Sequence, residues 1–285
     1  MNSTKTIRDA VVSLRDQLSR ADIEDARLNA ELLVAHALRC DRSDLLVRAN
    51  ESLDSESASL LNDAASRRVK REPLEYIIGW REFYSRRFAC VPGVLIPRPE
   101  TETIVDECKR RLQRDFAGPA VDLGTGCGMV AITLALEFPR LRITATDIAQ
   151  EALNLTQQNA KTHGVSERVG TLRGDWLAPF EAKPQFALIV ANPPYVDLGY
   201  SPIMQPEVRD FEPPVAVFGG NGGLLHIKTI LPQVSPRLLP GGLFCMEFAA
   251  GQADDVRVLA EQAGLKQIEI ICDFAGIERT LVARK

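Results

Sequence analysis

Short apolar runs alternate with helix-like segments from residue 119 to the end of the chain. Most runs are too short for buried helices and are bounded by Gly, Pro or Asp, which is typical of buried strands. This alternation predicts an α/β fold, a doubly wound and mainly parallel sheet with helices on both faces. The predicted strands are 119–124, 142–147, 186–192, 242–248, 266–272 and 278–283, with a further apolar stretch at 169–172, and the predicted helices are 127–138, 151–163, 224–231 and 252–263. Ligands of such sheets bind at the carboxyl ends of the strands.

The N-terminal part has a different pattern. Apolar residues recur at helical spacing between residues 4 and 70, which predicts three or four helices, with a helix start at Ser55 and a stop at Pro73. Residues 75–96 are rich in aromatic and β-branched residues and contain a Pro92-Gly93 turn, which predicts a β-hairpin. We therefore expect a small helical domain at 1–74, a hairpin linker at 75–96 and the α/β domain at 97–285.

Composition is that of a globular protein. The net charge is −4, with 45% hydrophobic and 25% charged residues. No apolar run reaches about 18 residues, and the N-terminus carries charges where a signal peptide has an apolar core, so we expect neither a membrane protein nor export. The six cysteines are scattered, which predicts free thiols in a reducing cytoplasm and no metal site.

Residues 67–114 form a basic belt that contains 12 Lys or Arg and 7 Asp or Glu. Its densest part is Arg67–Arg71, followed by Arg81, Arg86 and Arg87. Such a belt either faces an acidic or nucleic-acid partner or is a solvated helix end whose cations suit the helix dipole. Charge runs alone do not decide between the two.

A glycine-rich turn, Asp122–Gly128, follows the first predicted strand. Glycines at alternate positions remove side chains where a backbone approaches a ligand closely. Met129 breaks the dinucleotide-binding spacing, and the lysine of a phosphate-binding loop is absent. Asp147, about 20 residues on, suits ribose hydroxyls, although alone it could only cap a helix. Together the turn and Asp147 favour a nucleoside without phosphates over NAD.

Asp175 and Trp176 follow the apolar stretch 169–172. Asp175 suits an adenine amino group and Trp176 suits the face of a ring, whereas the alternative for Trp176 is a core aromatic. The three histidines, His36, His163 and His226, have no catalytic context and are predicted to be structural or surface residues.

Asn192-Pro193-Pro194-Tyr195 ends the strand at 186–192. Two prolines fix φ and remove two backbone donors, so nearby carbonyls stay free as acceptors. Such a corner suits a planar NH2 group, with one hydrogen on the Asn192 oxygen, the other on the Pro193 carbonyl, and Tyr195 as a flat wall. An amide nitrogen is a poor nucleophile because its lone pair is delocalised. Holding both N–H bonds favours a pyramidal nitrogen whose lone pair points along the line of attack. The alternative is a Pro-Pro loop that simply ends a strand.

Together these motifs resemble the class I S-adenosylmethionine methyltransferases, and more narrowly the HemK/PrmC family of release-factor glutamine methyltransferases. Leu95–Glu102 is similar to the family signature that precedes the catalytic domain, and the segment from Phe211 to Gly222 is similar to a downstream family stretch. The sequence departs from the family at Cys127, where Ser or Thr is frequent, and after Glu247, where Phe-Ala replaces His-Gly.

The resemblance implies methyl transfer from S-adenosylmethionine to the side-chain N5 of the glutamine in the Gly-Gly-Gln motif of class 1 release factors, without a metal. It implies that 1–74 recognises the substrate and that 97–285 binds S-adenosylmethionine and catalyses. The implied catalytic residues are Asn192, Pro193, Pro194 and Tyr195. The implied cofactor-binding residues are Gly124, Thr125, Gly126, Cys127, Gly128, Asp147, Asp175, Trp176 and Asn192. A cytoplasmic monomer that does not read nucleic-acid sequence is expected.

Other functions remain open. A glutamine of a ribosomal protein or the N6 amino group of adenine in RNA or DNA presents the same two-hydrogen geometry, although the net charge of −4 and the lack of a DNA-reading module disfavour duplex DNA. A scaffold that binds S-adenosylmethionine without catalysis is disfavoured by the intact Asn192–Tyr195 motif, and an oxidoreductase by Met129. Glu100 and Glu102 either touch substrate or cap a helix that begins near Thr101.

Overall fold

The computed structural model describes residues 6–285, so the first five residues of the predicted domain 1–74 lie outside it. The chain divides into two compact units. The N-terminal unit comprises the described chain up to Trp80 together with Gln205–Phe211, and the α/β unit comprises Arg81–Met204 and Glu212–Lys285. The chain therefore passes between the units three times, at 80/81, 204/205 and 211/212.

The N-terminal unit is helical, as predicted. Its helices are α1 (Ile7–Arg20), α2 (Ala26–Ala37), α3 (Asp44–Val47), α4 (Ser55–Val69) and α5 (Leu74–Ile78), joined by α9 (Pro206–Phe211) from much later in the chain. Leu14 and Leu18 of α1 bury against Leu33 of α2 and Leu61 of α4, which is the helical spacing seen in the sequence. Helix α4 begins at Ser55 because the Asp54 carboxylate caps it.

Ion pairs attach α9 to this unit. Arg68 is buried and donates to Glu207 Oε1 at 2.8 Å, to Asn29 Oδ1 at 2.8 Å and to a backbone carbonyl. Arg71 donates to Glu207 Oε2 at 2.9 Å, and Arg67 pairs with Glu72 at 2.6 Å. The densest part of the basic belt is thus largely occupied within the N-terminal unit.

The β-hairpin is narrower than predicted. It consists of β1 (Trp80–Phe83) and β2 (Arg86–Ala89), and its turn is Tyr84-Ser85, both with positive φ. The predicted start at residue 75 is wrong because Leu74–Ile78 is helix α5, which ends where Gly79 adopts φ +85°. Pro92-Gly93 forms a turn after the hairpin, as a separate feature.

The α/β unit is built on a seven-stranded sheet in the order β5-β4-β3-β6-β7-β9-β8. Strands β5, β4, β3, β6 and β7 run parallel, and β9 is antiparallel to β7 and β8. The strands are β3 (Pro119–Leu123), β4 (Arg142–Asp147), β5 (Val169–Arg173), β6 (Phe186–Ala191), β7 (Leu238–Glu247), β8 (Lys266–Cys272) and β9 (Glu278–Arg284). The predicted doubly wound, mainly parallel sheet is confirmed.

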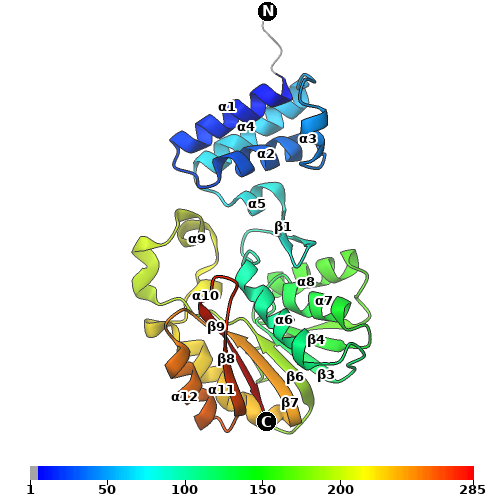
Figure 1. The fold of residues 1–285 in the computed structure, drawn as a ribbon, viewed down its shortest axis with the longest axis vertical. Helices are drawn as coiled ribbons and strands as arrows, with labels where there is room; N and C mark the ends of the chain where they lie inside the picture. The colour runs from blue at the N-terminus through cyan, green and yellow to red at the C-terminus, as the bar shows by residue number, and fades with distance from the viewer. Residues whose placement is uncertain (1–5) are drawn as a thin grey trace, which may run out of the picture. The chain divides into compact units, whose positions relative to one another are not determined.

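Helices cover both faces of this sheet (Figure 1). Helices α6 (Glu102–Arg111), α7 (Met129–Glu137) and α8 (Gln150–Thr162) bury one apolar core, and α11 (Leu225–Arg237) and α12 (Ala253–Gln262) bury the other. The shorter helical segments are η1 (Pro99–Thr101), η2 (Leu198–Ile203), α10 (Pro214–Val217) and η3 (Asn221–Gly223). Across the part of the chain that is described, no helix combines the length and apolar content needed to cross a bilayer.

The strand order places a topological switch at β3. The chain winds from β3 through β4 to β5 on one side and then returns to β6 on the other side of β3. In such sheets the carboxyl ends of the strands beside the switch open a crevice for ligands. The site is therefore expected beyond Leu123 and Ala191.

Candidate active site

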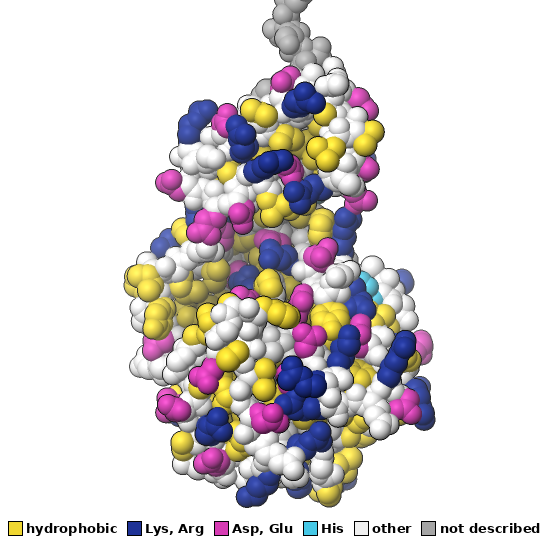
Figure 2. Space-filling view, in the orientation of Figure 1, with side chains coloured by type: hydrophobic (Ala, Val, Ile, Leu, Met, Phe, Trp, Pro, Cys, Tyr) yellow, Lys and Arg dark blue, Asp and Glu magenta, His cyan; other side chains and the backbone are white. Residues whose placement is uncertain are grey.

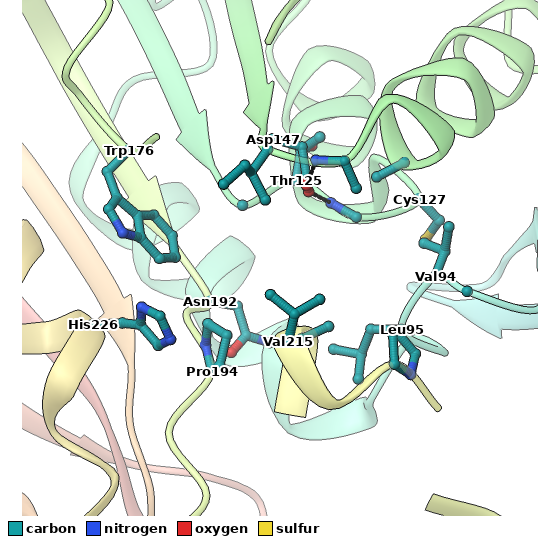
Figure 3. A pocket seen from close by; sticks show the side chains of 18 of the residues that line it. Val94, Leu95, Thr125, Cys127, Asp147, Trp176, Asn192, Pro194, Val215 and His226 are labelled. Atoms are coloured by element: carbon teal, nitrogen blue, oxygen red, sulfur yellow. Dashed lines mark hydrogen bonds between the residues drawn. The ribbon is translucent and has the colours of Figure 1, made fainter. Parts of the chain in front are cut away.

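A cavity opens at this switch point, with about 950 Å³ of empty space when its open mouth is included. Figure 3 shows Asp147 and Thr125 on one wall, Trp176 and His226 on another, and Asn192 and Pro194 beside Val215. Of the predicted site residues it is lined by Gly124, Thr125, Gly126, Cys127, Asp147, Asp175, Trp176, Asn192 and Pro194. Gly128, Pro193 and Tyr195 are not among its lining residues.

The glycine-rich turn between β3 and α7 shapes one wall. Gly124, Gly126 and Gly128 have φ of +68°, +59° and +83°, a region that disfavours other residues. A Cβ on Gly124 would lie 3.1 Å from the ring of Trp176, on the cavity side. One on Gly128 would lie 2.8 Å from Ile132, which lies in the core behind the turn. Gly124 thus keeps space beside Trp176, whereas Gly128 allows α7 to begin.

A buried carboxylate supports this turn from below. Asp122 Oδ2 accepts the Thr125 hydroxyl at 2.7 Å and the Ala131 N–H at 3.2 Å. Burial raises the pKa of Asp122 to about 6, despite those two hydrogen bonds. Asp122 is not a lining residue, so its role is to fix the turn.

Asp147 stands at the end of β4 and faces the cavity. Its Oδ2 accepts the Gly126 N–H at 3.0 Å and its Oδ1 accepts the Ala149 N–H at 2.9 Å, while burial raises its pKa. An ionised carboxylate offers about four acceptor positions, so each oxygen keeps one for a ligand. Asp147 does not cap the following helix, because the N-cap of α8 is Ala149 and no side chain caps it. The two backbone contacts orient the carboxylate and leave it able to accept hydroxyls.

An aromatic pair forms another wall. The rings of Trp176 and His226 lie 5.4 Å apart at 58°, and both residues line the cavity. His226 was predicted to be a structural or surface residue, because no motif in the sequence marks it as part of a site. It also missed the apolar lining residues Val94, Leu95, Ile148 and Val215, since single apolar residues in loops carry no pattern that marks a ligand site.

The Asn192–Tyr195 corner follows β6. Asn192 Nδ2 donates to Thr101 Oγ1 at 2.9 Å, which leaves Oδ1 as the acceptor end of that carboxamide. The Tyr195 hydroxyl donates to Glu247 Oε1 at 2.6 Å, and burial raises the pKa of Tyr195 well above its usual value. The Tyr195 ring packs on the core beneath α11 and α12.

The segment before α6 is bound to the rest of the α/β unit. Glu102 Oε1 accepts the Tyr84 N–H of the hairpin turn at 2.7 Å, whereas Glu100 lies in η1. Arg98 pairs with Glu212, whose Oε2 also accepts the Ile96 N–H at 3.3 Å. These contacts hold the Leu95–Glu102 segment against the wall of the cavity.

Elsewhere in the belt, cations also pair with carboxylates. Arg86 and Lys109 each lie 2.6 Å from an oxygen of Glu137, and these pairs lower the pKa of Glu137 against the effect of burial. Figure 2 shows Lys and Arg interspersed with Asp and Glu over the viewed face. The Arg86 side chain therefore already has an ion-pair partner within the protein.

The lining suits a nucleoside that lacks phosphates. It combines a carboxylate with free acceptor positions, a glycine turn that brings backbone close, and a flat aromatic wall. Among the lining residues, all of which the structure describes, there is no Lys or Arg. An adenosine that carries a sulfonium fits these features. Its ribose hydroxyls need hydrogen-bond acceptors, and its positively charged sulfur does not require a Lys or Arg in the lining.

Known protein families and curated proteins match this chain over most of its length. Residues 9–79 match the model of the PrmC N-terminal domain, and residues 105–202 match that of the methyltransferase small domain. The chain is 40% identical over 280 residues to the release factor glutamine methyltransferase of Koribacter versatilis, covering 98% of this chain and 99% of that one. It is 37% identical to the protein of that name from Geobacter sulfurreducens, covering 98% and 96%.

Solved structures of distant relatives share the fold. A methyltransferase from Pyrococcus furiosus superposes with a TM-score of 0.54 at 18% identity, covering 82% of this chain and 99% of that one. The 16S rRNA N2 G1207 methyltransferase of T. thermophilus, in complex with AdoMet and guanosine, gives a TM-score of 0.52 at 16% identity, covering 72% and 49%. At these identities the likeness concerns the fold alone.

Proposed function

The chain belongs to the family of release factor glutamine methyltransferases, and from this premise we propose that it methylates the side-chain N5 of the glutamine in the Gly-Gly-Gln motif of class 1 release factors. It is an S-adenosylmethionine-dependent protein glutamine methyltransferase. One observation carries the finer proposal. Asn192, whose carboxamide oxygen is left free by Thr101, lines the same cavity as Asp147 and the glycine turn.

The residues present suit S-adenosylmethionine. Asp147 would accept the ribose hydroxyls, the turn from Gly124 to Cys127 would hold the methionine part, and Trp176 would pack against the adenine with Asp175 near its amino group. When bound, the cofactor supplies a methyl group activated by a sulfonium, so the transfer needs no metal. The remaining work of the chain is to orient the amide nitrogen.

That orientation falls to the Asn192–Tyr195 corner. Asn192 Oδ1 and the Pro193 carbonyl would each accept one N–H of the substrate amide, which favours a pyramidal nitrogen whose lone pair is less delocalised into the carbonyl. As the new N–C bond formed and the C–S bond of the sulfonium broke, the nitrogen would gain positive charge, which the two fixed acceptors would stabilise, and one N–H proton would then pass to solvent water. Pro194, which lines the cavity, stiffens the corner, and Tyr195 would support it from the core side.

The test is a transfer assay. Protein is incubated with S-adenosylmethionine labelled in the methyl group and with a purified class 1 release factor, either unchanged or with the glutamine of Gly-Gly-Gln replaced by alanine. Label is expected on the unchanged factor alone, with mass spectrometry placing it on the glutamine side chain. Label that persists on the changed factor contradicts the assignment. Label on ribosomal protein or on RNA, each offered separately, would select another substrate.

The partner surface is a further part of the proposal. We assign recognition of the release factor to the N-terminal unit and the hairpin. We also propose that the protein acts as a monomer in the cytoplasm, where translation ends. Because Arg86 pairs with Glu137, reversing its charge would also disturb the fold. The binding test uses Arg87→Glu, which changes an exposed residue of β2, and Arg142→Glu, which changes an exposed residue at the start of β4, serves as control. If the Arg87 variant binds the release factor with unchanged affinity, the hairpin is not part of the surface that recognises the release factor.

A further inference from the structure

The segment Gly219–Gly223 lies against the Asn192–Tyr195 corner. The two prolines of the corner have no N–H, so this part of the backbone has few donors with which to hold itself in place. Strand β6 fixes the start of the corner, because Ala191 pairs with Leu123 on one side and with Met246 on the other. The end of the corner must be held by groups that reach its carbonyls.

Two glycines of this segment bring its backbone directly onto the corner. A Cβ on Gly219 would lie 2.7 Å from the Pro194 carbonyl oxygen, and a Cβ on Gly223 would overlap the Tyr195 carbonyl oxygen. The Gly219 N–H donates to the Val196 carbonyl at 2.9 Å. A side chain at either glycine would push the corner out of place, so the close contact requires glycine at both.

Gln252 joins this segment to the corner. Its side chain is buried, and its Nε2 donates to the Tyr195 carbonyl at 3.2 Å and to the Gly222 carbonyl at 3.0 Å. Its Oε1 accepts the Ala249 N–H at 2.9 Å. A backbone N–H can only donate and a backbone carbonyl can only accept, so these partners fix the direction of the Gln252 carboxamide. Gln252 is not a lining residue of the cavity.

These contacts occupy the last two carbonyls of the corner and leave that of Pro193. The Tyr195 carbonyl accepts from Gln252, and the Pro194 carbonyl lies against Gly219. The Pro193 carbonyl accepts no hydrogen bond from any residue that the structure describes. This is the carbonyl that would accept one N–H of the substrate amide.

We propose that Gln252 is a positioning residue for the Asn192–Tyr195 corner. Together with the Gly219–Gly223 segment it holds the end of the corner, while β6 holds the start. The Pro193 carbonyl and Asn192 Oδ1 then keep a fixed spacing, so both can accept hydrogen bonds from one amide nitrogen. This inference rests on the proposed function.

The first test replaces Gln252 by methionine, which has a similar length and removes the side-chain hydrogen bonds. We expect kcat to fall about tenfold or more, because the Tyr195 and Gly222 carbonyls lose their donor and the corner can shift. The affinity for S-adenosylmethionine, measured by calorimetry, should change less than about threefold, since Gln252 does not line the cavity. A kcat equal to that of the unchanged protein, or an affinity that falls as far as kcat does, overturns the proposal.

Gln185 provides a matched control. Its Nε2 also donates to two backbone carbonyls, those of Glu181 at 2.7 Å and Lys183 at 3.4 Å. It precedes β6, whereas the corner follows the other end of that strand. Gln185→Met therefore makes the same chemical change away from the corner and should leave kcat unchanged. Equal losses of kcat in the two methionine variants would contradict a specific role for Gln252.

Gly219→Ala tests the glycine segment without changing Gln252. The added Cβ would press on the Pro194 carbonyl oxygen, so we expect kcat to fall about tenfold or more. Gly242→Ala in β7 is the control, because its Cβ would lie 2.9 Å from the Leu239 carbonyl oxygen and neither glycine has positive φ. Urea unfolding should show a loss of stability in both variants, but only Gly219→Ala should lose kcat. A wild-type kcat in Gly219→Ala overturns the proposal.

Hydrogen exchange gives a readout that needs no methyl transfer. The Val196 N–H, which directly follows the corner, donates to the Val217 carbonyl at 3.1 Å. If Gln252 holds the end of the corner, this amide should exchange at least about tenfold faster in Gln252→Met than in the unchanged protein, and Gln185→Met should not change it. Unchanged exchange in Gln252→Met overturns the positioning role. The proposed function fails separately, if the unchanged protein transfers no methyl group to the release factor.

Discussion

The Gly126 N–H donates to Asp147 Oδ2 over 3.0 Å, so the glycine turn after β3 and the carboxylate after β4 form one rigid wall. The Ala149 N–H holds the other oxygen at 2.9 Å. The carboxylate is thus oriented before any ligand arrives, which reduces the entropy lost on binding.

Replacing Asp147 by alanine should weaken S-adenosylmethionine binding about tenfold to a hundredfold, because hydrogen bonds to a charged group contribute about 1.5–3 kcal/mol. Calorimetry with S-adenosylmethionine and S-adenosylhomocysteine measures this, and both should lose affinity equally since they share the ribose. Asp210→Ala, which removes an exposed carboxylate on α9, serves as the control. An unchanged dissociation constant in the Asp147 variant would exclude it from the ribose site.

Alanine substitutions in the turn should differ in their effect on stability. Gly126→Ala meets open space, with Val94 at 3.9 Å, and costs about 1 kcal/mol for its positive φ alone. Gly128→Ala adds contacts of 2.8 Å to Ile132 and 2.9 Å to Thr156, so overpacking adds about 1–3 kcal/mol. Urea unfolding compares them, with Gly164→Ala as a control that has positive φ and free space. Equal losses at Gly126 and Gly128 would contradict the packing argument.

Asn192→Ala should lower kcat far more than it changes the affinity for S-adenosylmethionine. We expect a loss of at least about a hundredfold in kcat, because a fixed acceptor for the reacting nitrogen is removed. Single-turnover methylation gives the rate and calorimetry the affinity. A rate that survives the change would show that another group holds the amide.

The pH dependence of stability should carry the signature of Asp122. Because burial raises its pKa to about 6, the folded protein binds a proton there that the unfolded chain releases near pH 4. The stability linked to Asp122 is therefore fully present below about pH 4 and is lost as the pH rises through about 6. The loss is on the order of 3 kcal/mol at most.

Asp122→Asn removes this titration. The free energy of unfolding of the variant, taken relative to the unchanged protein, should rise between about pH 4 and pH 7. Urea titrations at several pH values give this difference, and titrations common to both proteins largely cancel. A difference that does not vary with pH would mean that Asp122 keeps an ordinary pKa in the folded protein.

Much of the α/β core was predictable from the sequence. Buried strands such as Phe186–Ala191 are short apolar runs whose ends coincide with turn residues, so periodicity located them closely. Helix α5 was not predictable, because Ile77 and Ile78 favour strands and only packing in the N-terminal unit makes them helical. The recruitment of Gln205–Phe211 to that unit was missed as well, since it depends on long-range pairs that no local pattern records.

The candidate site divides in the same way. Glycines, Asp147 and the Asn192–Tyr195 motif carry their chemistry in residue type and spacing, and the structure places most of them around one cavity. The predicted role of each residue stays a prediction. The contacts of Thr101 with Asn192 and of Glu247 with Tyr195 were not predicted. Each joins residues that are far apart in the sequence, and no local pattern marks such a pair.

The three chain passages between the units limit how the protein can be shortened. Deleting the chain up to Trp80 would remove Arg68 and Arg71, the two arginines that pair with Glu207. Helix α9 would then lose the unit on which it packs, and the Glu207 carboxylate would lose both ion-pair partners. Helix α9 begins at Pro206, and η2 lies between it and the Asn192–Tyr195 corner. An isolated α/β unit would therefore differ from the whole protein in the freedom of the loop that follows the Asn192–Tyr195 corner.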